Sequence, residues 1–267
     1  MADAVQEQYT RGDLLETVLG ALRDAGLDPD ALDASALAPA EELHLLGRTA
    51  TIALAERAAV TELDRVLDVG SGIGGPARYL AANLGCEVTG IDLTQELCDV
   101  ATELTRRVGL HDKVTFQQGD ALDLPFTDGE FDVVWTQHAS MNVADKARFF
   151  AELRRVVVTG GRLACFDLLA GPNQPIHFPV PWADEAAVSH LATPDETRDL
   201  LAGAGFDVRS WEDLTHEAVG YLRQLAAPTG ALGPHLVVPD LATKAAVLRR
   251  NIDEGRIVVV RVVADAA

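Results

Sequence analysis

Apolar residues at the spacing of amphipathic helices mark the first sixty residues of the chain. One helix is predicted over residues 14–22, and a second from about Glu41 to residue 55. A polar linker rich in Asp, Pro, Ser and Ala, residues 28–39, connects them. We therefore expect residues 1–60 to form an N-terminal helical cap.

The pattern changes from residue 65 onward, where short apolar runs alternate with stretches of helical periodicity. The runs are nearly unbroken, which is typical of strands buried on both faces. Strands that alternate with helices imply crossover connections and a parallel sheet covered on both sides. The strands are predicted at 65–69, 87–91, 114–117, 131–135, 162–169, 206–211 and 256–263, and the helices at 76–84, 94–108, 145–157 and 193–203.

Two segments interrupt this alternation. Residues 171–184, with the sequence GPNQPIHFPVPWAD, follow neither the helical nor the strand period. Residues 215–255, between the last two predicted strands, return to helical spacing. Because insertions of this length are usually binding elements, we expect a helical lid there.

The charge balance narrows the classes of partner. The 267 residues include 41 Asp and Glu against 22 Lys and Arg, a formal net charge of −19. A surface that binds phosphates needs clustered Lys and Arg, so nucleic acid and anionic membranes are not expected partners.

The remaining composition predicts a cytoplasmic protein. The three cysteines have neither disulfide nor zinc spacing, so no metal is expected. The N-terminus resembles no secretory signal, and no apolar stretch is long enough to span a membrane.

A glycine-rich turn follows the first predicted strand and opens a helix. Gly70, Ser71, Gly72 and Gly74 belong to a formal G-x-G-x-x-G pattern, which fits a dinucleotide site, another cofactor site or a tight structural turn. Asp68 lies two residues before the first glycine. A carboxylate there would repel a pyrophosphate and suits a ligand that carries an ammonium and a sulfonium.

Later segments help to separate these ligands, although the first of them fits both. The second strand ends in Asp92, where an acid can accept from ribose hydroxyls in either kind of site. The third strand is followed by Gly119-Asp120-Ala121-Leu122-Asp123-Leu124-Pro125-Phe126, and a later helix ends in Leu153-Arg154-Arg155-Val156. With Leu67 to Gly75 and Gly90-Ile91-Asp92, these segments resemble the class I S-adenosylmethionine-dependent methyltransferases over residues 40–210. The similarity is greatest to the ubiquinone/menaquinone-methyltransferase-like branch, with its sarcosine/dimethylglycine and natural-product methyltransferases. One departure is Val158-Thr159-Gly160-Gly161, where the family usually has Arg-Pro-Gly-Gly.

The resemblance implies an α/β fold, a Rossmann-like, doubly wound and mostly parallel seven-stranded sheet with an antiparallel last strand. The chain would divide into the cap at 1–60 and a methyltransferase domain at 61–267 that carries the lid at about 215–255. The turn from Asp68 to Gly74 would hold the methionine part of the cofactor. The other implied cofactor contacts are Asp92 to the ribose, Leu93 against the adenine, Asp120 and the Ala121 backbone to the adenine amino group, and Gln137 near the sulfonium. Asp120 is also consistent with an ordinary turn acid, and Gln137 with a structural role.

The acceptor side is less defined. His138, just after the fourth strand, is the candidate catalytic base, and a histidine that orients substrate or is merely packed fits the same position. His177, Phe178 and Trp182 are candidate substrate contacts, although a surface loop also accounts for His177. His44 and Arg48 could close over the cofactor, and Tyr9 could belong to an N-terminal lid. The cap and the lid are candidate surfaces for a homodimer.

The expected activity is methyl transfer from S-adenosylmethionine to a small organic acceptor, on C, N or O of a specialised metabolite, by direct displacement. The alternatives are a glycine/sarcosine/dimethylglycine-type N-methyltransferase, a non-methylating relative that binds the cofactor, and an NAD(P)-dependent oxidoreductase.

Overall fold

A computed structural model describes residues 2–225 and 230–267. Four helices precede the first strand: α1 (Ala2–Tyr9), α2 (Leu14–Asp24), α3 (Ala38–Glu41) and α4 (Gly47–Arg57). The second helix was predicted from about Glu41, but α4 starts only at Gly47, so the predicted start is wrong. Leu46 and Gly47 interrupt the helix because both adopt a left-handed backbone, with φ of 63° and 51°. This break leaves residues 42–46 as a non-helical connection between α3 and α4, with a turn at residues 45 and 46.

Seven strands form one sheet in the order β3-β2-β1-β4-β5-β7-β6. The first five are parallel, and β7 runs antiparallel to both β5 and β6. This arrangement confirms the predicted α/β sheet with its antiparallel last strand. The strands are β1 (Arg65–Val69), β2 (Glu87–Asp92), β3 (Val114–Gln118), β4 (Phe131–Gln137), β5 (Val157–Ala170), β6 (Phe206–Asp213) and β7 (Ile257–Ala266).

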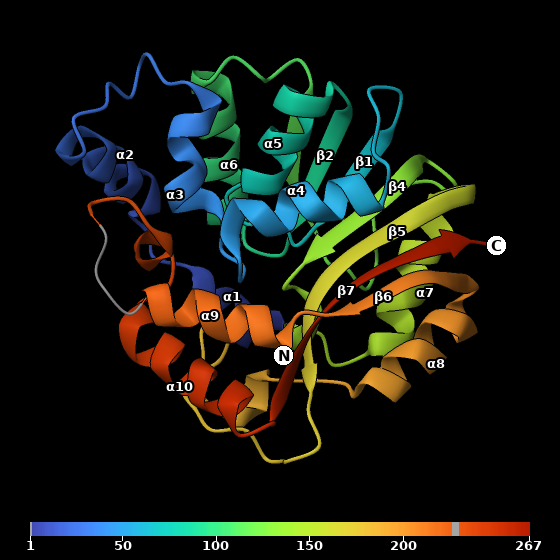
Figure 1. Cartoon of the computed structure of the whole chain (residues 1–267). Coiled ribbons are helices and arrows are strands. Elements are labelled where there is room, and N and C mark those ends of the chain that lie inside the picture. The colour runs from blue at the N-terminus through green and yellow to red at the C-terminus, as the bar shows by residue number, and fades with distance from the viewer. Residues whose placement is uncertain (1, 226–229) are drawn as a thin grey trace.

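Helices cover both faces of the sheet (Figure 1). Side chains of α4 and α5 (Gly75–Leu84) share one buried apolar cluster with the sheet, and α7 (Lys146–Val156) and α8 (Pro194–Ala204) share another. A third cluster joins α2 to α6 (Gln95–Arg107). The two-sided covering explains why the central strands are nearly continuous apolar runs.

The junction between α7 and β5 differs from the sequence prediction. The strand begins at Val157, five residues before the predicted start, and α7 ends at Val156. Val157 pairs with Phe131, and the register then shifts before Val133 pairs with Arg162. β5 thus includes Gly160 and Gly161. A pattern of apolar residues does not identify these two glycines as strand residues.

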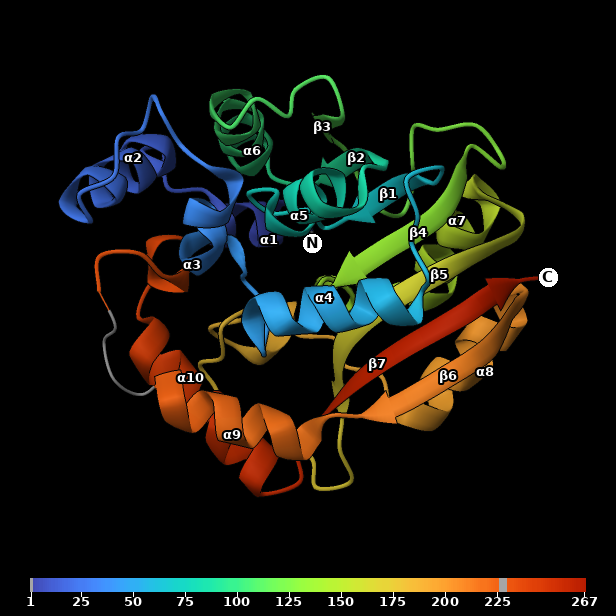
Figure 2. The ribbon, with the colours of Figure 1, turned by 45° about the horizontal axis from the view of Figure 1, so that its top comes forward.

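Between β6 and β7, where the lid is predicted, the described residues include two α-helices. They are α9 (Thr215–Leu225) and α10 (Leu241–Asp253), which we call the lid helices. Figure 2 shows them beside one another and away from α7 and α8. Within the described ranges, no helix is long and apolar enough to cross a membrane.

Candidate functional site

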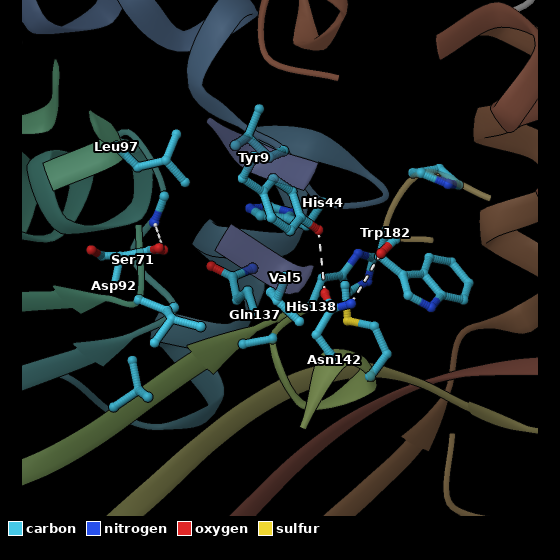
Figure 3. A pocket seen from close by; sticks show the side chains of 18 of the residues that line it. Val5, Tyr9, His44, Ser71, Asp92, Leu97, Gln137, His138, Asn142 and Trp182 are labelled. Atoms are coloured by element: carbon cyan, nitrogen blue, oxygen red, sulfur yellow. Dashed lines mark hydrogen bonds between the residues drawn. The ribbon is translucent and has the colours of Figure 1, made fainter. Parts of the chain in front are cut away.

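A cavity of about 400 Å³ opens at the carboxyl ends of the parallel strands, where ligands bind in such sheets. Its walls come from the ends of β1, β2 and β4, from α1, from the 42–46 connection and from the lid helices (Figure 3). Among the predicted site residues, those that line it are Asp68, Gly70, Ser71, Gly72, Asp92, Leu93, Asp120, Ala121, Gln137, His138 and Trp182. Gly74, His177 and Phe178 are not among the lining residues.

The glycine-rich turn needs its glycines for two different reasons. Gly70 has φ of 78°, and a Cβ there would lie 2.5 Å from the Cβ of Ala139. Gly74 has φ of 86°, and a Cβ there would lie 2.5 Å from the ring of Phe116 and 2.8 Å from the guanidinium of Arg78. Gly70 therefore allows the turn to approach the loop after β4, whereas Gly74 allows the start of α5 to pack on its neighbours.

Asp92 holds this turn from the adjacent strand. Its Oδ2 accepts from the Gly72 N–H at 2.9 Å and its Oδ1 from the Thr94 N–H at 2.9 Å. Burial raises the pKa of Asp92, and the two N–H groups counteract that rise because they favour the charged form. Next to it, the Leu93 carbonyl accepts from the side-chain amide of Gln6 at 2.8 Å, which attaches α1 to this edge of the cavity.

Asp68 is a buried acidic side chain of the site that no cationic side chain compensates among the causes that shift its pKa. Its side chain is 2% exposed, and its Oδ2 has no hydrogen-bond partner among the described residues. Burial, with further contributions from the negative charges of Asp92 and Glu42, raises the pKa of Asp68 to about 8. A buried carboxylate in this state is stabilised by a cationic ligand.

Asp120 and Ala121 line the cavity after β3. The Asp120 carboxylate is exposed and accepts from the Leu122 N–H at 2.9 Å, so it closes its own turn. This contact leaves further acceptor positions on the carboxylate for a ligand.

Gln137 is the last residue of β4 and His138 follows it, and both line the cavity. The Gln137 carbonyl oxygen accepts from the Trp135 indole at 2.9 Å and from the Thr51 hydroxyl at 3.3 Å, while its Nε2 has no partner in the described part of the chain. These two contacts fix the position of Gln137 and leave its amide nitrogen free to donate to a ligand.

His138 has a left-handed backbone, with φ of 50°, a strained conformation for a residue with a side chain. Its ring stacks on Phe166 at a centroid distance of 4.9 Å, and its Nε2 is buried without a partner among the described residues. Burial and the nearby His44 lower the pKa of His138 well below the ordinary value of 6.5. The imidazole is therefore neutral at pH 7.

A buried ionic network joins three lining residues of the cavity, Glu41, Glu42 and His44, to two arginines behind them. His44 Nε2 lies 2.7 Å from Glu42 Oε2, and Arg48 pairs with both Glu41 and Glu42. Arg78 pairs with Glu41 at 2.6 Å. His44 lines the cavity as expected, whereas Arg48 is not among the lining residues and neutralises the two glutamates.

The three candidate substrate contacts separate in the structure. Trp182 lines the cavity and is 1% exposed. His177 instead lies 2.9 Å from Glu254 and donates its backbone N–H to Asn251 at 2.7 Å, so it joins residues 171–184 to the end of α10. Phe178 packs against the apolar cluster that contains α4 and α5.

Tyr9, named above as a possible part of an N-terminal lid, lines the cavity, whereas the sequence pattern missed Asn142 and other lining residues. The Tyr9 hydroxyl donates to Asn142 Oδ1 at 3.3 Å, and the Asn142 amide donates to the Trp182 carbonyl at 3.0 Å (Figure 3). Met141 and the lid residue Tyr221 were also missed. For Tyr9 the available signal was its position before the first long helix; the others follow no motif.

Metal ligation finds no support in the part of the chain that the structure describes. No group of three or more His, Cys, Asp or Glu side chains there is arranged to hold a metal ion.

Comparison with known proteins agrees with the geometry. Residues 67–165 match the family model of a methyltransferase domain. The chain is 45% identical over 102 residues to tocopherol O-methyltransferase of Arabidopsis thaliana, covering 38% of this chain and 29% of that protein. It is 34% identical over 155 residues to 27-O-demethylrifamycin SV methyltransferase of Amycolatopsis mediterranei, covering 57% of each.

A solved structure resembles the whole fold. The [4+2]-cyclase SpnF superposes with a TM-score of 0.71 at 23% identity, over 99% of this chain and 96% of that one. The curated relatives are matched over only 27% to 57% of their own lengths. In its matched domain, its motifs and its fold, the chain is similar to the class I S-adenosylmethionine-dependent methyltransferases.

Proposed function

We propose that this protein transfers a methyl group from S-adenosylmethionine to a small organic acceptor. The observation that carries the proposal is the Asp68 carboxylate, buried at the end of β1 beside the glycine-rich turn and without a partner among the described residues. A cofactor with an ammonium and a sulfonium supplies the positive charge that this carboxylate lacks. The pyrophosphate of a nicotinamide cofactor would add negative charge at the same place.

The cofactor half of the cavity follows from this placement. We propose that Asp68, Gly70, Ser71 and Gly72 hold the methionine part, with Gly74 maintaining the turn. Asp92 and Leu93 would contact the ribose and the adenine, Asp120 and Ala121 the adenine amino group, and Gln137 the region of the sulfonium. These residues, apart from Gly74, all line the same cavity, which supports their assignment to one bound cofactor.

The reaction needs mainly alignment and exclusion of water. When bound, S-adenosylmethionine supplies a methyl group on a sulfonium that departs as a thioether, so the leaving group needs no acid. Because the neutral imidazole of His138 has an unpaired, buried Nε2, we propose that it accepts the proton of an acceptor that is protonated at neutral pH. The lid helices, α1 and Trp182 would exclude water from the reacting atoms.

Cofactor binding is tested by isothermal titration with S-adenosylmethionine at pH 7 in two buffers of different ionisation enthalpy. Asp68, with a pKa of about 8, is largely protonated at pH 7, and a bound cation favours its charged form. We therefore expect binding with release of close to one proton at pH 7 and little release at pH 9. Absence of binding, with tight binding of NAD(P)H instead, would contradict the proposal.

A non-methylating relative is the second candidate, because the fold resemblance to a [4+2]-cyclase covers almost the whole chain. Both candidates bind the cofactor, so binding does not separate them. Incubation with methyl-labelled S-adenosylmethionine and a panel of phenols, amines, indoles and isoprenoid or polyketide intermediates does. Labelled product is expected; cofactor binding without label transfer to any acceptor would favour the second candidate.

We further propose that residues 1–60 form the cap and 61–267 the methyltransferase domain, with the lid at about 215–255. We also propose a cytoplasmic location, supported by three buried cysteines that are all unpaired in the structure.

A further inference from the structure

The cavity has two halves of different chemistry. In the cofactor half, Asp68 and Asp92 lie at the ends of β1 and β2, Asp120 follows β3 and Asp145 precedes α7. Two more carboxylates, Glu41 and Glu42, line the cavity from the end of α3 and the connection after it. The other half is apolar, with Met141 and Trp182 on one side and Leu222, Val238, Leu241 and Leu248 of the lid on the other. Among the described lining residues, Tyr221 is the only polar side chain that the lid contributes.

Neither sign of charge finds a partner in the apolar half. No Lys or Arg occurs among the described residues that line the cavity. The two glutamates that line the cavity, Glu41 and Glu42, are already paired with Arg78, Arg48 and His44. An ion that entered the apolar half would lose its hydration without gaining a counter-charge.

We propose that the acceptor is an uncharged, mainly apolar molecule that fills this half and brings its single reactive polar group to His138. The inference rests on the proposed function, because the methyl group must meet the acceptor at that histidine. The His138 Nε2, buried and unpaired among the described residues, is the polar atom available to it. Small amino acids and phosphorylated acceptors are disfavoured, because the apolar half offers nothing for a carboxylate or phosphate.

The test uses two fluorescent probes with one scaffold. N-phenyl-1-naphthylamine is neutral, and 8-anilinonaphthalene-1-sulfonate is the same ring system with one sulfonate added. Both are titrated into the full chain saturated with S-adenosylhomocysteine. The neutral probe is expected to bind at least about tenfold more tightly, because the sulfonate is desolvated without a cation. Equal or tighter binding of the sulfonate would overturn the proposal.

Substitutions at two neighbouring alanines on α10 test where the neutral probe binds. Ala245 lines the cavity, whereas Ala246 is exposed and is not among the lining residues. Ala245→Phe is expected to weaken binding of the neutral probe at least about fivefold by occupying the apolar half, and Ala246→Phe to leave it unchanged. Equal effects of the two variants would place the probe elsewhere and contradict the inference.

A charge introduced at the rim gives a reciprocal test. Leu241, half-buried at the start of α10, is changed to Arg, which is expected to improve sulfonate binding relative to the neutral probe. An unchanged ratio of the two affinities would count against the inference. If S-adenosylhomocysteine itself fails to bind, the proposed function fails, and the probe titrations on the ligand-free protein still test the apolar half. If it binds and the neutral probe does not, only the acceptor class is wrong.

Discussion

At the scale of single residues, the site is defined by polar atoms that the described protein leaves unpaired. Asp68 Oδ2, Ser71 Oγ, Gln137 Nε2 and His138 Nε2 are all buried without a hydrogen-bond partner among the described residues, and all four residues line the cavity. Such atoms are costly in a folded chain unless a ligand satisfies them. Their concentration in one cavity is consistent with a site organised for a bound molecule.

Replacing Asp68 with Asn should have opposite effects on binding and on stability. We expect S-adenosylmethionine affinity to fall by about tenfold or more, because the variant cannot balance a cation. The folded-state pKa of Asp68 is raised, so its burial penalises folding progressively as pH rises from about 4 to 8. The ligand-free variant should therefore be more stable than the wild type at pH 8, by about 1–3 kcal/mol.

Calorimetry and urea unfolding at pH 5 and pH 8 measure the two effects. The stability gain should shrink at pH 5, where the wild-type carboxyl is protonated. Asp112→Asn, at a side chain that is 92% exposed, is the matched control. A variant that binds the cofactor as tightly as the wild type would remove the basis for assigning Asp68 to the cofactor.

Replacing His138 with Ala should lower turnover without weakening the cofactor. A lost general base typically costs about 10²–10⁴ in rate. Because the pKa of His138 is lowered well below 6.5, the wild-type rate should stay flat across pH 7–8 and fall only at acidic pH, where the imidazole is protonated. The exposed His111, changed to Ala, is the control. Full activity of His138→Ala would mean that this histidine packs in the structure and does not act as the base.

At the scale of elements, backbone conformation decides how strand and helix meet. The turn between β1 and α5 places Gly74 against Phe116 and Arg78, so the glycine serves both its φ of 86° and a close contact. Gly109, after α6, has a similar φ of 71°, but a Cβ there would have no atom within 4 Å. Comparing substitutions at these two glycines therefore distinguishes the effect of backbone strain from the effect of crowding by a new Cβ.

Gly74→Ala should cost more stability than Gly109→Ala. The second substitution introduces only the strain of a left-handed backbone, about 1 kcal/mol, whereas the first adds overpacking of about 1–3 kcal/mol. Urea unfolding of both variants beside the wild type gives the difference. Equal losses would show that Phe116 and Arg78 move aside freely.

At the scale of the whole molecule, the charge of −19 must be held in one compact fold. Like charges that repel one another destabilise the compact state, and salt screens them. We expect the melting temperature to rise by a few degrees between 20 mM and 500 mM NaCl. Potassium chloride at the same ionic strength should act equally. A falling melting temperature would mean that the surface ion pairs outweigh the repulsion.

The same scale shows what a sequence pattern reveals. The sheet was predictable because its central strands are buried. The residues proposed for the cofactor could be named because they lie at or after the ends of successive strands, at fixed spacing. The acceptor half was not predictable, because it depends on contacts between distant segments. The Tyr9 hydroxyl meets Asn142, and the Tyr221 hydroxyl lies 3.3 Å from the position of a Cβ on Gly47. No local period encodes such pairs.

The placement of the lid helices has a consequence for how such proteins diversify. The lid leaves the sheet after β6 and returns at β7, two strands that pair directly, and the Leu214 N–H donates to the Val259 carbonyl at its base. The two ends of the lid therefore lie next to each other, and β6 pairs with β7 without using lid residues. The lid can therefore be exchanged as a unit. Replacing residues 215–255 with those of a relative offers a route to a new acceptor and leaves the residues proposed for the cofactor unchanged.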